Sequence, residues 1–306
     1  MQLALDMLLR VKLRLGLVVF LAVWSSVPPI LVRRAWAESS VADLRSEVRQ
    51  ADPPSRLPAA PEPAPAPRKP DSSSFDSNGE CDEGDDLGLY ALAGYFGLFV
   101  VMTPFTVPKS FLEDNNTHLG RFSGHPYLEN DGYMVFDGYL KGPADWSARL
   151  TAEYGDEFST NNWIAGRWLV EHSNRLGIDG AVTYLMEETA PSVTDDFLYG
   201  DTNVTWRFAQ NEWAQMRAGI GLNWLADDLG SDLGVNFTYG GDFYPLEPLV
   251  LSGDLDIGSL NHALLLHLRG TVGVQIHRCE VFTGYDYLQL DHSNVHGLIA
   301  GVRLWF

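Results

Sequence analysis

The chain has 306 residues, of which 45% are hydrophobic and 12% aromatic, and its formal net charge is −19. The apolar fraction excludes a wholly disordered chain, and the acidic excess argues against nucleic acid as a partner, because phosphate backbones attract lysine and arginine. Two cysteines exclude a disulfide scaffold and cannot by themselves form a four-ligand zinc site.

Residues 1–37 have the three parts of a secretory signal peptide. Basic residues within positions 10–14 precede the apolar run LGLVVFLAVW, and Ala35-Trp36-Ala37 provides a small-residue cleavage site. An uncleaved membrane anchor is the alternative, because the apolar stretch 15–32 approaches spanning length. Serine and proline interrupt that stretch, so we predict cleavage and export.

Residues 38–86 are rich in proline, serine and acidic side chains, as in PPSRLPAAPEPAPAPRKP and DSSSFDSNGECDEGDD. Such a composition buries too little apolar surface to offset the entropy cost of ordering the chain. We therefore predict a semi-extended periplasmic linker that reaches toward the cell wall.

Residues 87–131 are less regular. The stretch 87–102, LGLYALAGYFGLFVVM, is apolar on both faces and is compatible with a strand or a short helix. Residues 103–131 are predicted to form the longest external loop. The stretch 132–140, GYMVFDGYL, alternates and predicts a strand that pairs with the one beginning at Trp146.

From Trp146 to the C-terminus, apolar side chains at every second position recur in ten segments separated by polar turns. This period of two places alternate side chains on opposite faces of a strand. The apolar face carries no acidic or basic residue. The opposite face carries the predicted lumen-facing charges: Arg149, Glu153, Arg167, Glu171, Asp179, Asp201, Arg207, Arg217, Asp242, Asp254, Asp256, Arg269, Asp286 and Arg303.

Alternation alone does not tell whether the apolar face points inward, as in a soluble calycin-like barrel, or outward to lipid. The turns favour lipid: the connections at 155–162, 187–196 and 226–232 are longer and acidic, whereas those at 173–175 and 210–212 are short. Aromatic residues also gather at the ends of the apolar faces, as in interfacial girdles. They are Trp146, Trp206, Phe208, Phe243 and Phe306 toward one rim, and Tyr154, Trp224, Tyr239 and Tyr287 toward the other.

The final strand, GLIAGVRLWF, alternates apolar residues that include Leu298, Val302 and Leu304 and ends on Phe306. It resembles the C-terminal assembly signal of Gram-negative outer-membrane β-barrel proteins. The resemblance implies insertion into outer-membrane lipid by the barrel-assembly machinery, with both termini periplasmic, and implies no substrate. The chain is also similar to uncharacterised secreted barrel-like proteins of planctomycetes, which implies no activity.

These features predict an all-β fold, an antiparallel up-and-down transmembrane β-barrel over residues 132–306. We predict twelve strands, with 132–140 and 87–102 included, because bacterial single-chain barrels have even strand numbers. Ten strands are the alternative, with both segments omitted.

Six arginines and eight acidic residues on the inward face are expected to pair across a narrow lumen. We therefore predict an outer-membrane barrel that is structural or surface-active, with a largely plugged lumen. A narrow channel for small charged solutes is the first alternative, and a soluble exported calycin-like barrel is another.

Lipid hydrolysis is the enzymatic alternative, since lipid-hydrolysing outer-membrane barrels carry H-x-S-N. The chain has His172-Ser173-Asn174 and His292-Ser293-Asn294 without the intervening residue, which places base and hydroxyl on opposite faces of a strand. We predict no enzymatic activity and no cofactor. We also predict no metal site, because His267 and His277 are about 33 Å apart along one strand.

The two cysteines, Cys81 and Cys279, lie in the predicted linker and in a predicted periplasmic turn. Both would face an oxidising compartment from the same side of the membrane. We therefore predict a Cys81–Cys279 disulfide that ties the linker to the barrel rim.

Overall fold

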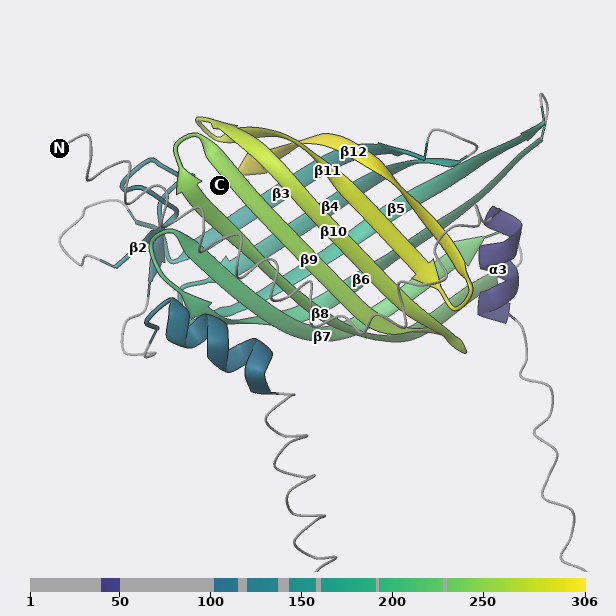
Figure 1. The fold of residues 1–306 in the computed structure, drawn as a ribbon, viewed down its shortest axis with the longest axis horizontal. Helices are drawn as coiled ribbons and strands as arrows, with labels where there is room; N and C mark the ends of the chain where they lie inside the picture. The colour runs from purple at the N-terminus through teal and green to yellow at the C-terminus, as the bar shows by residue number, and fades with distance from the viewer. Residues whose placement is uncertain are drawn as a thin grey trace, which may run out of the picture. The chain divides into compact units, whose positions relative to one another are not determined.

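The computed structural model describes residues 40–49, 102–114, 120–136, 143–157, 161–190, 193–227 and 230–306. Ten antiparallel strands of this part form a closed barrel (Figure 1). Their bounds are β3 Trp146–Asp156, β4 Asn161–His172, β5 Leu176–Ala190, β6 Val193–Gln210, β7 Ala214–Asp227, β8 Gly230–Leu246, β9 Leu249–Leu260, β10 Ala263–Ile276, β11 Cys279–Leu290 and β12 Ser293–Trp305. Each strand pairs with the next, and β12 pairs with β3 to close the barrel.

The strand number is ten, the smaller of the two numbers that the sequence allows. The predicted strand at 132–140 is not part of the barrel: within it, only Met134–Val135 (β2) is described as extended, and β2 pairs with Arg121–Phe122 (β1). Both edges of β3 are already occupied, by β4 and β12. Of the other candidate, 87–102, only Met102 lies within the described residues, and it is helical.

The hairpins are longer and their turns shorter than predicted. Most of the expected loops at 155–162, 187–196 and 226–232 is strand, and the strand bounds leave only 157–160, 191–192 and 228–229 as connections. The physical reason is that ladder hydrogen bonds join backbone groups, so acidic side chains at alternate positions do not end a strand.

Two-residue turns join β9 to β10, β10 to β11 and β11 to β12. They begin at Asn261, His277 and Asp291, which have φ values of 54°, 54° and 46°. Asparagine, aspartate and histidine tolerate this left-handed conformation best among residues with a side chain. We call the end of the barrel where β3 begins and β12 ends the near rim, and the opposite end the far rim.

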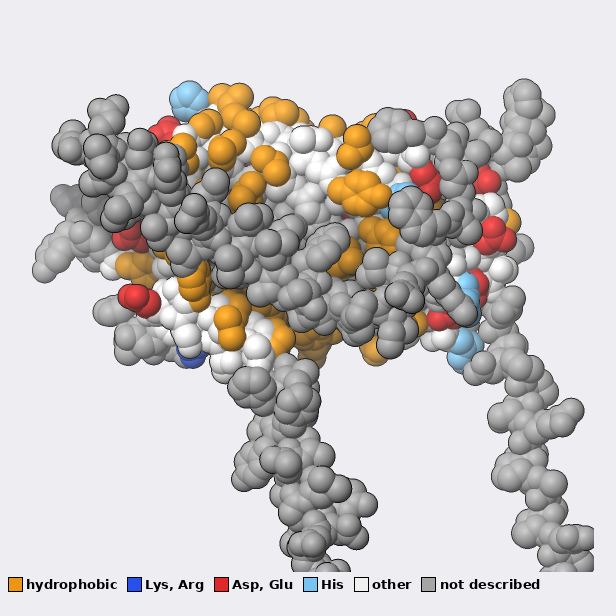
Figure 2. Space-filling model, in the orientation of Figure 1, with side chains coloured by type: hydrophobic (Ala, Val, Ile, Leu, Met, Phe, Trp, Pro, Cys, Tyr) orange, Lys and Arg blue, Asp and Glu red, His pale blue; other side chains and the backbone are white. Residues whose placement is uncertain are grey.

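The apolar face of the strands points outward, away from the lumen. Ile220, Val235 and Leu233 are 72%, 66% and 65% exposed, and comparable outward side chains lie on each of the ten strands. Figure 2 shows hydrophobic side chains along the barrel wall between its two ends. A calycin-like barrel would bury this face around its lumen, whereas here the charged face lines the lumen.

The aromatic residues of the two predicted girdles lie toward the expected rims, with one exception. Trp146, Trp206 and Phe306 lie toward the near rim, where their strands begin or end. Tyr239 does not belong to the far rim: it pairs in register with Ala218, which lies opposite Trp206, and it packs against Phe208. The early start of β8, at Gly230 instead of after the predicted loop 226–232, places Tyr239 deeper along its strand than the sequence implied.

Residues 102–111 are helical, and the helix covers part of the outer wall near the near rim (Figure 1). Phe105 packs edge-on against Phe208 of β6 and Tyr239 of β8, with ring centroids 5.1 and 6.1 Å away. Leu112 is buried in the same cluster. The predicted external loop 103–131 is therefore wrong in this part, because its apolar side chains bind the apolar face of the barrel. No described helix is long and apolar enough to cross a membrane.

A second helix, α3 (Val41–Arg49), lies at the far rim (Figure 1). It falls inside the predicted semi-extended linker, so that prediction does not hold for residues 41–49. A capping box begins the helix: the Asp43 N–H donates to the Ser40 hydroxyl and the Ser40 N–H donates to the Asp43 carboxylate, both at 3.0 Å. The pattern S-x-x-D at residues 40–43 is a local signal for the start of a helix, although the composition of 38–86 is that of a linker.

Candidate functional site in the barrel lumen

The fourteen charged residues predicted to face the lumen all lie on the inner side of the barrel. Alternation places them there, because each shares its parity along the strand with the buried side chains. Ten of them are buried: Arg149, Glu153, Glu171, Arg207, Arg217, Asp242, Asp256, Arg269, Asp286 and Arg303. The other four, Arg167, Asp179, Asp201 and Asp254, line the central cavity.

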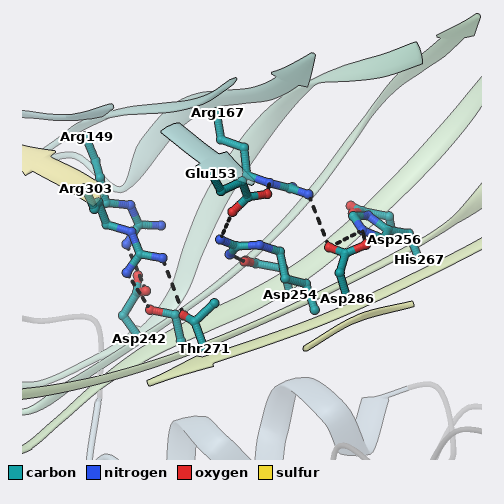
Figure 3. A network of polar contacts seen from close by, with 12 residues as sticks. Arg149, Glu153, Arg167, Asp242, Asp254, Asp256, His267, Thr271, Asp286 and Arg303 are labelled. Atoms are coloured by element: carbon teal, nitrogen blue, oxygen red, sulfur yellow. Dashed lines mark hydrogen bonds and ion pairs between the residues drawn. The ribbon is translucent and has the colours of Figure 1, made fainter. Parts of the chain in front are cut away.

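Asp242 is the best-enclosed carboxylate of the lumen, with no exposed surface. One of its oxygens lies 2.8 Å from the Arg149 guanidinium, and the other lies 2.8 Å from that of Arg217. The side-chain amide of Gln215 donates a third hydrogen bond at 3.0 Å. This carboxylate of β8 thus binds side chains of β3 and β7. Figure 3 shows Asp242 beside Arg149.

The ion pairs continue from Arg217 across the barrel. Arg217 also binds Asp254 at 2.5 Å, and Arg269 binds both Asp254, at 3.4 Å, and Glu153. Glu153 in turn accepts a 2.9 Å hydrogen bond from Arg167. Charges of opposite sign therefore alternate through the middle of the lumen, which offsets much of the cost of burying them.

His267 ends this chain of contacts. Its Nδ1 lies 3.2 Å from Asp256 and its Nε2 lies 3.0 Å from Asp286, whose other neighbour is Arg167 at 3.7 Å. His277 is part of a near-rim turn, so the two histidines are far apart, as the sequence indicates. Among the described residues, no three histidine, cysteine or acidic side chains are grouped to hold a metal ion.

Amide side chains bind two further acidic residues of the lumen. Asn203 donates hydrogen bonds to Asp179 at 2.8 Å and to Asp201 at 2.7 Å, and Asn236 donates to Asn203 at 2.9 Å. The inward asparagines therefore extend the polar network on the β5–β8 side of the lumen.

Glu280 is a lumen residue that the sequence analysis missed. It has no exposed surface, binds Arg303 at 2.7 Å and accepts a 3.1 Å hydrogen bond from the indole of Trp305. The sequence predicts a turn at Cys279, but β11 already begins there. The parity that Glu280 shares with Asp286 is the signal that identifies it.

Polar contacts also fasten the near rim. Arg207 binds Glu171 at 2.9 Å. Arg175, in the turn after β4, forms two hydrogen bonds of 2.6 and 2.8 Å with Asp114, which lies three residues after the end of the outer-wall helix. Asp114 thus connects the covering segment to the barrel rim.

Aromatic side chains close the near end of the lumen. Phe122 and Tyr133 come from the segment 120–136 and form a buried cluster with Tyr244 and Trp305. The rings of Tyr133 and Trp305 are 4.9 Å apart. Burial raises the pKa of Tyr133, so its hydroxyl stays protonated where it hydrogen-bonds Ser147.

The space left inside the barrel is small. A cavity of about 50 Å³ lies among the charged residues, and a second of about 20 Å³ lies beside His267 and Leu265. Such volumes hold a few water molecules and no solute. Charged and polar side chains line both cavities.

The two His-Ser-Asn triplets lie at turns. The His172 ring packs on Trp146, with centroids 4.5 Å apart, and its Nδ1 accepts a hydrogen bond from the Asn174 N–H. His292 is 3.7 Å from Glu47, and Ser293 is buried. In this described part of the chain, no hydrogen bond joins either histidine to the hydroxyl of its adjacent serine. The absence of enzymatic activity stays a prediction.

The other sequence-predicted residues lie at the near rim or on the outer wall. Leu298, Val302, Leu304 and Phe306 point outward and are 41–50% exposed. Cys279 begins β11, and no disulfide links it to another described residue. Cys81 lies outside the described residues, so the disulfide stays a prediction.

No protein-family model matches the chain, and no curated protein matches it in sequence. Among solved structures, the chain is similar to Ail, the attachment invasion locus protein of Yersinia pestis, with 15% identity over 53% of this chain and 96% of that one, at a TM-score of 0.25. It is similar to the β domain of the Bordetella autotransporter BrkA, with 14% identity over 52% and 98%, at 0.29. A porin gives 10% identity over 61% and 73%, at 0.27. Scores of this size carry no inference about function.

Proposed function

We propose that this chain is an integral outer-membrane β-barrel with a closed lumen, and that it serves as a structural or surface protein rather than a transporter. The observation that carries the proposal is the outward apolar face, on which Ile220 is 72% exposed in the middle of β7. Water would meet a continuous apolar surface here, whereas lipid hydrocarbon would match it. Strands of 11 to 18 residues are long enough to span a bilayer.

The closed lumen is supported from three directions. Ion pairs cross its middle, the aromatic cluster around Tyr133 covers the near end, and α3 covers the far end. A channel for small charged solutes is the second candidate, since arginine and aspartate line the central cavity. The central cavity, of about 50 Å³, is too small to hold an ion together with its water shell.

The membrane part of the proposal is tested by expressing the full chain in a Gram-negative host and fractionating the envelope. We expect the protein in the outer-membrane fraction, extractable only with detergent, and migrating differently on an electrophoresis gel before and after boiling. Recovery as a detergent-free, water-soluble monomer would refute it.

The closed lumen is tested by reconstituting the purified protein in a planar bilayer. We expect no unitary current above background at any applied voltage, because the charged side chains of the lumen are paired with one another. Reproducible single-channel current steps that are absent when the protein is omitted would refute the closed lumen and favour the channel. Contacts with the assembly machinery, and with the cell wall through the linker, belong to the same proposal.

A further inference from the structure

α3 fills the far mouth of the barrel with its apolar face. Val41, Leu44 and Val48 repeat at helical spacing, and none of them has exposed surface. They pack into a cluster of apolar side chains that point into this end of the lumen and include Leu185, Phe197, Leu225, Leu260, Leu265 and Leu290. The lumen is therefore ionic in its middle and apolar beneath α3.

Polar contacts hold both ends of the helix. At the N-terminus, the Val41 N–H donates to the Glu187 carboxylate at 2.7 Å. At the C-terminus, the Asn261 amide donates to the Val48 carbonyl at 3.0 Å. These partners satisfy backbone groups that a helix end leaves open.

Two arginines of α3 bind the acidic far rim. Arg49 forms two parallel hydrogen bonds with Asp227, at 2.7 and 3.0 Å, and one with Asp232 at 3.1 Å. Arg45 lies 2.7 Å from the same Asp227 carboxylate. Asp227 has no exposed side-chain surface. The bidentate pair of Arg49 with Asp227 fixes the orientation of α3 on the rim as well as its position.

The position of α3 has a consequence for the membrane. Ser40 and α3 lie at the far rim, whereas Trp305 and Phe306 lie at the near rim (Figure 1). In a barrel that spans a bilayer these are opposite sides, which differs from the expectation of two periplasmic termini.

We propose that α3 is an intramolecular plug of the far mouth, held by Arg45 and Arg49 on Asp227, and that Ser40 and α3 lie on the side of the membrane opposite to the C-terminus. The burial of α3 stands on the contacts above. The sidedness rests on the proposed membrane function, so the two parts are tested separately.

The plug is tested in detergent by the rate of maleimide labelling of single cysteines, with Cys81 and Cys279 replaced by serine. We expect Leu44→Cys to react roughly tenfold or more slowly than Ala42→Cys, because Leu44 is buried and Ala42 is exposed on the same helix. Adding Asp227→Asn is expected to remove most of this difference. Adding Arg121→Ala, which breaks an exposed pair at the near rim, is the matched control and leaves it unchanged.

Equal rates for Leu44→Cys and Ala42→Cys would overturn the plug. Hydrogen exchange of the unsubstituted protein supplies a second measurement: the amides of residues 44–48 are expected to be protected in the wild type and to exchange faster in Asp227→Asn. Wild-type amides without protection would refute the plug even if every cysteine variant failed to fold.

Sidedness is tested on intact cells with a membrane-impermeant maleimide. We expect Ala42→Cys at the far rim to be labelled, and Glu212→Cys in the exposed near-rim turn to be labelled only after the outer membrane is disrupted. Labelling of both, or of neither, on intact cells would overturn the opposite-sides proposal. Failure of the membrane function itself would appear as loss of the protein from the outer-membrane fraction.

Discussion

Replacing Asp242 by asparagine is expected to lower the free energy of unfolding by about 3–5 kcal/mol. The carboxylate has no exposed surface and is the shared partner of Arg149 and Arg217. Its neutralisation leaves two buried guanidinium groups facing each other with too little negative charge between them. The cost of the unpaired charges dominates, because the substitution keeps the size of the side chain.

The effect of Asp242→Asn is measured by urea unfolding of the protein in lipid vesicles. Asp145→Asn is the matched control, since it removes an exposed partner of Arg121 at the near rim. In the native protein the hydrogen bond from Arg121 lowers the pKa of Asp145, but water screens this pair. We expect no measurable change in the control. An equally small change in Asp242→Asn would mean that water fills the lumen, which would refute its closed state.

Replacing Ile220 by arginine is expected to destabilise the protein by about 2–4 kcal/mol in lipid vesicles. Ile220 is 72% exposed at the middle of β7, where a membrane-spanning barrel meets the centre of the hydrocarbon. Arginine there has to leave water or distort the bilayer to reach it. On a soluble barrel the same substitution at so exposed a position would be nearly neutral.

The contrast with a rim residue makes this prediction specific. Glu129→Arg places the same side chain at an exposed position of the near-rim segment, outside the apolar belt, and we expect unchanged stability. Both variants are compared by the urea concentration at which half of the protein in vesicles is unfolded. Equal midpoints would show that Ile220 does not face lipid.

Much of the barrel could be predicted because the strand period assigns every residue to one of two faces. The alternation of apolar and polar residues around Ile220 and Asp242 shows which face of the strand each occupies. No long-range information is needed to place Ile220 outward and Asp242 inward. Glu280 follows the same rule, but the sequence predicts a turn at Cys279 and therefore places the start of this strand after Glu280.

The strand count could not be predicted in this way. The alternation in 132–140 is as regular as in a barrel strand, but pairing is decided by which edge is free, and β12 already occupies the edge of β3. The helix α3 was missed for a related reason: the composition of 38–86 is that of a linker, and three apolar residues in it become a core only against the far mouth.

By itself, the sequence determined the faces of the strands and the sign of fourteen charges inside the barrel, because these depend on residue type and on a period of two. The tertiary structure decided that ten strands close, which arginine binds which carboxylate, and that segments before the barrel cover both of its ends. Closure brings together residues such as Arg269 and Glu153, 116 positions apart, and no local pattern encodes that distance.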